Sequence, residues 1–205
     1  MSFSKRDLDS YERNDLFSEK RSLSDAELVI LAQAGDKIAF DFICERYYNQ
    51  IYRFQTRMVG DSWTGEDLAQ ETFLKAWKAL TALRDPPKFL SWLYRIAANE
   101  VFSYRRRPEV LTRGSYNQKL ECLQVSIPGP EKQVEAQERL EQILALISPE
   151  KCRACFILYH IEGYSILQIA EFLGIKQSSV RQYISSGLSQ LRRLWEEDDT
   201  SKEKR

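Results

Sequence analysis

The chain has 205 residues, a length typical of one large or two small domains. Hydrophobic residues make up 43% and charged residues 29%, which suits a helical protein, and the 30 basic and 30 acidic residues cancel. No run of about 18 apolar residues occurs, and the first 15 residues lack the apolar core of a signal peptide, which excludes membrane-spanning and secreted classes and predicts a cytoplasmic protein. His160 is the single histidine, so a metalloenzyme or a histidine-dependent hydrolase is disfavoured, and we expect no metal, no cofactor and no enzymatic activity.

The first 107 residues divide into a tail and one helical domain. Residues 1–23 are polar and alternate in charge, which predicts a flexible or weakly helical tail. Residues 24–107 begin with Ser24 and Glu27, a spacing typical of a capping box, and continue with apolar residues at helical intervals. Glycine–aspartate pairs and a double proline interrupt this pattern. They divide the domain into four helices, with apolar stripes in residues 28–32, 38–58, 68–80 and 89–107.

The second half of the chain begins with a change of composition. Residues 108–132 contain scattered glycines, prolines and polar residues, and a stretch of about 25 residues is too long for a connection inside one domain, which predicts a flexible linker. Residues 133–196 are again helical, with a helix predicted from the Ser148 cap to Glu162 and a last helix from 177 to 195, and residues 197–205 form a charged tail. The predicted fold class is all-α, with two small helical domains joined by the linker.

Residues 165–184 have the pattern of a helix-turn-helix. Ala170 is small enough for a close helix crossing, and Gly174 tolerates the backbone angles of the turn. Apolar anchors occupy both helices at Ile169, Leu173, Ile175, Val180 and Ile184. The turn and the outer face of the second helix then carry amide, hydroxyl and cationic groups suited to base edges and phosphates. These candidate DNA-binding residues are Lys176, Gln177, Ser178, Ser179, Arg181, Gln182 and Ser185. An ordinary helical hairpin is the alternative, and the combined spacing disfavours it.

The charge of each domain limits how such a motif can act. Residues 24–107 carry a net charge of +1, and residues 133–205 carry −1. Because contacts to phosphates supply much of the affinity of a DNA-binding protein, tight independent binding to a duplex is not expected. Either a large partner supplies the affinity or the basic residues are clustered locally.

Three segments resemble the bacterial RNA polymerase sigma factors. Residues 148–175 resemble their C-terminal DNA-binding domain, residues 66–77 the segment that grips a coiled coil of the polymerase largest subunit, and residues 89–99 the promoter-melting segment. The two domains stand in the family's order without an intermediate domain, which is similar to the small extracytoplasmic-function group. The resemblance implies a sigma factor that binds core RNA polymerase and directs promoter-specific initiation by recognising and melting promoter DNA, with residues 24–107 as domain 2 and residues 133–196 as domain 4.

The same resemblance implies roles for particular residues. Core polymerase would be bound by Asp67, Gln70, Glu71 and Leu74. The minus-ten element and the spacer would be bound by Lys88, Phe89, Asn99, Arg105, Arg106 and Arg107, and the minus-thirty-five element by the helix-turn-helix residues. Asn99 would hold a base flipped out of the duplex, and the arginines would contact phosphates. Phe89, Trp92 and Tyr94 could stack on unpaired bases, although Trp92 shares a helix face with Ile96 and is therefore expected to lie mainly in the core. A solvated acidic stripe, a plain surface asparagine and arginines that stabilise a helix C-terminus are the respective structural alternatives.

Two departures from the family pattern affect promoter recognition. Positions that are often basic along the recognition helix hold Tyr183, Ser186, Leu188 and Gln190, which predicts weak phosphate anchoring. The loop at 83–88, which in the family cups the flipped base, contains two prolines and is expected to be stiff. The resemblance further implies contacts with the clamp coiled coil and flap of the polymerase, and an anti-sigma factor covering both domains as a partner that holds many members inactive.

Two other functions remain open. A stand-alone helix-turn-helix regulator would need a basic domain or a dimer interface, which the near-neutral domains do not indicate. A thiol-based redox sensor would use Cys152 and Cys155, whose spacing also suits a metal site shared with His160. These cysteines share one helix face next to Phe156 and Tyr159, which favours packing in a core.

Overall fold

The computed structural model describes residues 20–107, 140, 143–144 and 146–202, and every regular element in this part of the chain is helical. The predicted linker at 108–132 and most of the predicted N-terminal tail lie outside the described residues. Residues 20–22 are helical, and Lys20 and Arg21 form ion pairs with Asp36 and Glu45, so the last residues of the predicted tail are held against the first domain.

The N-terminal domain consists of α2 (Asp25–Gln33), α3 (Lys37–Val59), α4 (Ser62–Ala79), the short 3₁₀ turns Leu80–Ala82 and Pro86–Lys88, and α5 (Phe89–Arg105). The capping box predicted at the start of α2 is present: the Glu27 N–H donates to Ser24 Oγ over 3.4 Å, and the Ser24 N–H donates to Glu27 Oε2 over 2.8 Å. Gly60 ends α3 in the left-handed region at a φ of 81°. These local signals place the helix boundaries near the predicted ones.

A buried polar contact holds the three longest helices of this domain together. The Gln55 side-chain amide on α3 donates to Thr72 Oγ1 on α4 over 2.9 Å and to the Ala97 carbonyl on α5 over 3.1 Å. Gln55 and Thr72 are fully buried among apolar side chains, where an unpaired polar group would be costly. The contact therefore fixes how α3, α4 and α5 lie relative to one another.

The C-terminal helices are α8 (Glu150–Phe156), a π-helical segment (Ile157–Ile161), α9 (Ile166–Leu173) and α10 (Gln177–Lys202). The single helix predicted from Ser148 to Glu162 is wrong in two respects. Pro149 is the N-terminal cap, because the Ser148 backbone N–H and carbonyl pair instead with the Gln190 side chain on α10. The helix also changes to the π form after Phe156.

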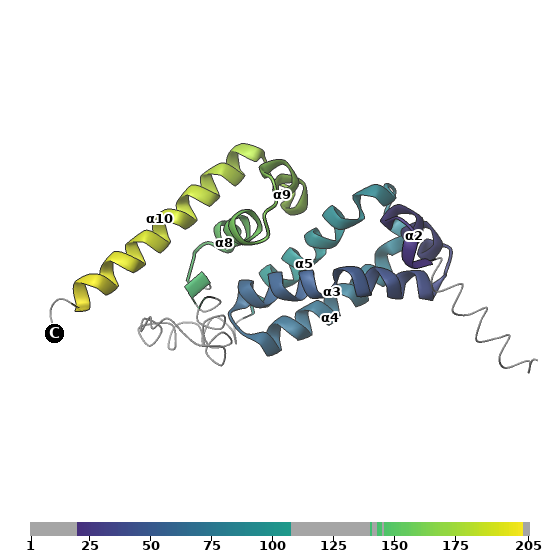
Figure 1. Cartoon of the computed structure of the whole chain (residues 1–205), viewed down its shortest axis with the longest axis horizontal. Coiled ribbons are helices and arrows are strands. Elements are labelled where there is room, and N and C mark those ends of the chain that lie inside the picture. Colours follow the sequence, from purple (N-terminus) through teal and green to yellow (C-terminus); the bar gives the residue numbers. More distant parts are fainter. Residues whose placement is uncertain (1–19, 108–139, 141–142, 145, 203–205) are drawn as a thin grey trace, which may run out of the picture.

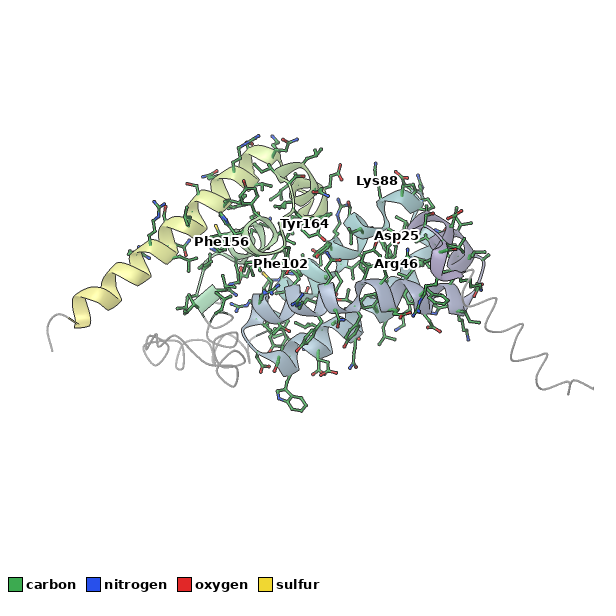
Figure 2. The ribbon with its side chains drawn as sticks, viewed as in Figure 1. Asp25, Arg46, Lys88, Phe102, Phe156 and Tyr164 are labelled. Atoms are coloured by element: carbon green, nitrogen blue, oxygen red, sulfur yellow. The ribbon has the colours of Figure 1, made fainter. Side chains whose placement is uncertain are left out.

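The two halves pack against each other in a single core. Figure 1 shows the C-terminal helices beside α5, with α10 extending away from the rest of the molecule. The Tyr94 ring on α5 stacks on Phe172 of α9, with ring centroids 4.6 Å apart, and meets the edge of Tyr164 at 5.4 Å. Figure 2 shows Tyr164 at this junction. The division into two helical domains stays a prediction, and helices from both predicted domains are in direct contact.

Candidate protein and nucleic-acid interfaces

The helix-turn-helix has the local geometry that the pattern predicts. Ser165 caps α9 through a capping box with Gln168, and Gly174 makes the turn in the left-handed region at a φ of 63°. The Ile175 N–H then donates to the Ala170 carbonyl over 3.0 Å, and Val180 is fully buried. These contacts fix the first turns of α10 against α9.

The predicted DNA-binding face is gathered on the first turns of α10 and its preceding turn. Its exposed members are Lys176, Gln177, Ser178, Arg181, Gln182 and Ser185, while Ser179 is half-buried. The free N–H groups at the start of a helix favour a phosphate there. This face combines hydrogen-bonding side chains with two cations, as a reader of a major groove requires.

The positions expected to be basic lie on a different side of α10. Tyr183 and Leu188 pack against the hydrophobic core, and Ser186 and Gln190 are half-buried. Gln190 is also bonded to the Ser148 backbone. Packing within the domain accounts for their lack of charge, and the weak phosphate anchoring that the sequence predicts stays a prediction.

The residues predicted to bind polymerase all lie exposed on α4. They are Asp67, Gln70, Glu71 and Leu74, and Leu74 is 52% exposed. Glu71 pairs with Lys75 over 3.5 Å, and Lys75 also pairs with Glu100 on α5 over 2.6 Å. A stripe that served only to be solvated would consist of polar side chains, so the exposed Leu74 beside these carboxylates is not explained by solvation alone.

A groove of about 600 Å³ runs beside this face between α3 and α4. Its lining consists of Gln70 and Leu74 together with Lys37, Phe40, Asp41, Cys44, Tyr48, Phe73 and Trp77. Most of these side chains are apolar, and burial raises the pKa of the Cys44 thiol to about 12. The groove therefore adds an apolar surface beside the four residues of α4 that the sequence predicted.

The residues predicted to bind the minus-ten element are less uniform. Lys88, Asn99, Arg106 and Arg107 are exposed, and Figure 2 shows Lys88 at the outer end of α5. The Arg105 side chain turns inward, where its guanidinium donates to the Val59 carbonyl over 3.4 Å and burial lowers its pKa. Because it stabilises the C-terminus of α3, Arg105 is not presented to phosphate in this arrangement.

The expectation that Phe89 stacks on an unpaired base needs correction. Phe89 is fully buried, and its ring packs between Tyr47 and Trp92, with centroids 6.0 and 5.9 Å away. Sequence reasoning gave the core position to Trp92, which is only half-buried. The packing of α5 thus buries both Phe89 and Tyr94, which were expected to be able to stack on bases, and leaves Trp92 partly exposed.

A cavity of about 390 Å³ adjoins the loop at 83–88. It is lined by Ala82, Leu83, Arg84, Asp85, Lys88, Ser91, Trp92, Arg95 and Glu171. Three of these side chains are cationic, and Trp92 supplies an aromatic ring. Sequence reasoning missed Arg84, Ser91 and Arg95, although the four-residue spacing of Ser91 and Arg95 places both on one face of α5.

The C-terminal half closes one side of this cavity. Glu171 on α9 accepts a hydrogen bond from Arg95 through its backbone carbonyl over 3.0 Å, and its carboxylate approaches Ser91 Oγ at 3.5 Å. Two further polar contacts, Gln50–Tyr164 and Arg57–Glu162, join α3 to the segment before α9. The helix-turn-helix thus lies directly on the face of α5 that carries the cavity.

The cysteine pair is enclosed in the C-terminal core. Cys152 and Cys155 are 2% and 0% exposed, and burial raises the pKa of both thiols, that of Cys155 to about 12. Both therefore remain protonated near neutral pH, which argues against a thiol switch. Within the described residues no three side chains of the metal-binding types gather at one point, and none of the helices is long and apolar enough to cross a membrane.

Two protein-family models match this chain, and together they include α4, α5 and α9. The family "Sigma-70 region 2" matches residues 43–109, and "Sigma-70, region 4" matches residues 140–191. The chain is 31% identical over 171 residues to the ECF RNA polymerase sigma-E factor of Haemophilus influenzae, covering 79% of this chain and 90% of that protein.

Solved structures agree at the level of the fold. The structure of CnrH in complex with the cytosolic domain of CnrY is similar with a TM-score of 0.65 and 23% identity, covering 85% of this chain and 98% of that one. The sigma factor RpoE in complex with the anti-sigma factor NepR, from Bartonella quintana, is similar with a TM-score of 0.57 and 21% identity over 77% of this chain and 96% of that one.

Proposed function

The chain belongs to the extracytoplasmic-function sigma factors of bacterial RNA polymerase, and from this premise we propose that three faces of its helices divide the work of initiation. As a sigma factor it binds core polymerase and directs promoter-specific initiation by recognising and melting promoter DNA. The main support for this proposal is that one chain carries two different exposed faces on separate helices. The face on α4 is acidic and apolar, and the face on α10 is polar.

The polymerase contact is assigned to α4, within domain 2 at residues 24–107. Asp67, Gln70, Glu71 and Leu74 lie on one face of the helix, within about two helical turns, so one partner helix could contact all four. Carboxylates on this face suit a basic partner, and Leu74 with the adjoining groove suits an apolar one. The clamp coiled coil of the polymerase largest subunit is the proposed partner, and the flap is proposed to hold domain 4.

The minus-ten element is assigned to α5 and the loop before it. Asn99 presents an amide that can read the edge of a base once that base has left the duplex. The cavity at the 83–88 loop is suited to such a base, because it combines the Trp92 ring with the cations of Arg84, Lys88 and Arg95. Arg106 and Arg107 follow on the exposed end of the helix and would hold spacer phosphates.

The minus-thirty-five element is assigned to α10, within domain 4 at residues 133–196. Gln182 and Arg181 can form paired hydrogen bonds with purine edges in a major groove, and Lys176 can hold a phosphate. A face with two cations provides few phosphate contacts, so polymerase supplies most of the affinity.

The closed arrangement of the two halves must open for both elements to be bound. The elements lie about 25 base pairs apart, which is roughly 85 Å along a duplex, whereas α9 and α5 are in direct contact. The 32 residues between Arg107 and Leu140 can span up to about 110 Å when extended. Polymerase binding is proposed to separate the halves. An anti-sigma factor, the kind of partner found in complex with the similar RpoE of Bartonella quintana, is proposed to keep the halves of this chain together.

Catalysis and location follow from this role. We assign no chemical step to the chain, since the polymerase carries out nucleotidyl transfer, and we place the chain in the cytoplasm, where the polymerase acts. The cost of unstacking promoter bases is met by binding to polymerase, phosphates and the upstream element together.

The function is tested by reconstitution. Purified chain is added to bacterial core polymerase with fragmented genomic DNA, and the 5′ ends of the transcripts are sequenced. We expect starts at a discrete set of sites that share two upstream motifs, and none of these starts with core polymerase alone. Sequence-specific binding to DNA without polymerase, combined with no directed starts, would instead favour the stand-alone regulator.

A further inference from the structure

Trp63 is the most exposed of the large apolar side chains in the described part of the chain, at 80%. Tryptophan is usually well buried on average, and an exposed one is more common where a protein meets a partner. The exposure of Trp63 does not result from a loose first turn of α4, because contacts of the neighbouring residues hold this turn in place. The Thr64 N–H donates to the Asp61 carboxylate over 2.8 Å, and Gly65 packs against Thr56 of α3.

Trp63 shares one face of α4 with the residues assigned to polymerase. Steps of four, three and four residues lead from Trp63 to Asp67, Gln70 and Leu74, and such steps stay on one side of a helix. The opposite side is buried against α3 and α5, at Leu68, Ala69, Thr72 and Ala76. The exposed face is therefore continuous over about 16 Å from Trp63 to Leu74.

The two ends of this face are apolar and its middle is polar. Trp63 stands at one end, and Leu74 with the groove beside α3 stands at the other. Glu66, Asp67 and Gln70 lie exposed between them. Apolar anchors around a polar centre suit an amphipathic helix that carries basic side chains in its middle turn and apolar side chains one to two turns on either side.

We propose that Trp63 is a docking residue for core polymerase, inserting into an apolar site on the same coiled coil that the α4 face contacts. This inference rests on the proposed assignment of that face to polymerase, and it adds an anchor one turn beyond it. Continuity with the face and its charge select polymerase as the occupant. An exposed indole that becomes buried is also the type of side chain that contributes most to protein interfaces.

The affinity test uses the full chain and core polymerase. Trp63→Ala is expected to weaken binding at least tenfold, while Trp63→Phe retains most of the affinity because it keeps an aromatic ring. Ile30→Ala is the matched control, since this side chain is 54% exposed on another helix, and it should not change binding by more than about twofold. Circular dichroism and thermal unfolding should be unchanged for Trp63→Ala.

Asp67→Arg separates this inference from the assignment on which it rests. A loss of binding for Asp67→Arg with none for Trp63→Ala overturns the role of Trp63 alone. No loss for either variant, with polymerase still bound, overturns both assignments.

Hydroxyl-radical footprinting gives a direct reading of the indole. We expect the oxidation rate of Trp63 to fall several-fold when core polymerase is added and to stay constant when the chain is concentrated alone. Protection that depends on the concentration of the chain, with no further change on adding polymerase, would identify a second copy as the occupant and overturn the proposal.

Discussion

Gly65 determines how closely α3 and α4 approach each other. A Cβ atom at this position would lie 2.1 Å from Thr56 Oγ1 and 2.8 Å from the Thr56 Cα, so backbone as well as side chain is in the way. The same helix pair carries the groove and the proposed polymerase face. The identity of this one residue therefore affects both the packing of the domain and the position of its binding surface.

Gly65→Ala is expected to destabilise the chain by about 2–3 kcal/mol, because added volume in a packed contact forces the helices apart. The free energy of unfolding in urea measures this effect. Ser62→Ala, an exposed change in the same helix, is the control and should alter stability by less than about 0.5 kcal/mol. A cost below 1 kcal/mol for Gly65→Ala would mean that α3 and α4 are not in such close contact.

The buried thiols provide a second test at this scale, and it depends on pH. Burial raises the pKa of Cys44 and Cys155 to about 12, so little thiolate is present at pH 8.5, and alkylation by iodoacetamide should be much slower than in the urea-unfolded chain. Reactivity should rise only as the pH approaches 12. Mass spectrometry of each peptide gives the rates. Alkylation of native Cys155 at the unfolded rate would contradict its enclosure in the core.

At the scale of elements, each helix presents one face to the core and leaves another for partners. On α5, Phe89, Leu93 and Ala97 are buried, whereas Asn99 is exposed. On α10, Val180 is buried and Gln182 is exposed. The proposed contacts with the two promoter elements thus use side chains that contribute little to the stability of the fold.

Asn99→Ala should leave folding and polymerase binding unchanged and lower promoter opening at least tenfold, because an amide contact to a flipped base is lost. Permanganate reactivity of unpaired thymines in the holoenzyme complex measures the opening. Asn49→Ala replaces an exposed asparagine on α3 and should open promoters normally. Equal opening by both variants would reduce Asn99 to an ordinary surface residue.

At the scale of the whole molecule, the two halves cover each other's neighbouring surfaces. The Tyr94, Tyr164 and Phe172 rings form one cluster across the junction, and the Arg57–Glu162 ion pair stands beside it. Glu171 reaches the cavity that we assign to an unpaired base. A chain in this arrangement could dock on polymerase through α4, but it could not contact both promoter elements.

A tether between the halves tests this requirement. Ser91→Cys with Glu171→Cys, in a Cys122→Ser background, places two thiols where Ser91 and Glu171 now approach within 3.5 Å, so a short bismaleimide can join them. The joined chain should bind polymerase normally and lose at least nine-tenths of its directed transcription. Each single variant, carrying the same reagent, is the control for damage to the cavity. Full transcription by the joined chain would show that opening is not needed.

Local spacing determined much of this protein. The Ser24 and Ser165 caps, the Gly174 turn, the apolar stripe of each helix and the exposed faces of α4 and α10 all depend on residues within four positions of one another. Such signals are readable without the fold, because the helix brings these positions together wherever it lies. For the same reason the family resemblance and the helix-turn-helix could be identified from the sequence.

Tertiary structure decided the features that join distant parts of the chain. The burial of Phe89, the inward turn of Arg105 to Val59 and the half-burial of Tyr183 depend on which neighbours pack against each helix. The Tyr94–Phe172 stack and the approach of Glu171 to Ser91 join residues nearly 80 positions apart. No periodic pattern encodes such pairs, because they form only when separate helices pack. The closed junction, with the cavity that it covers, is therefore a property of the folded chain.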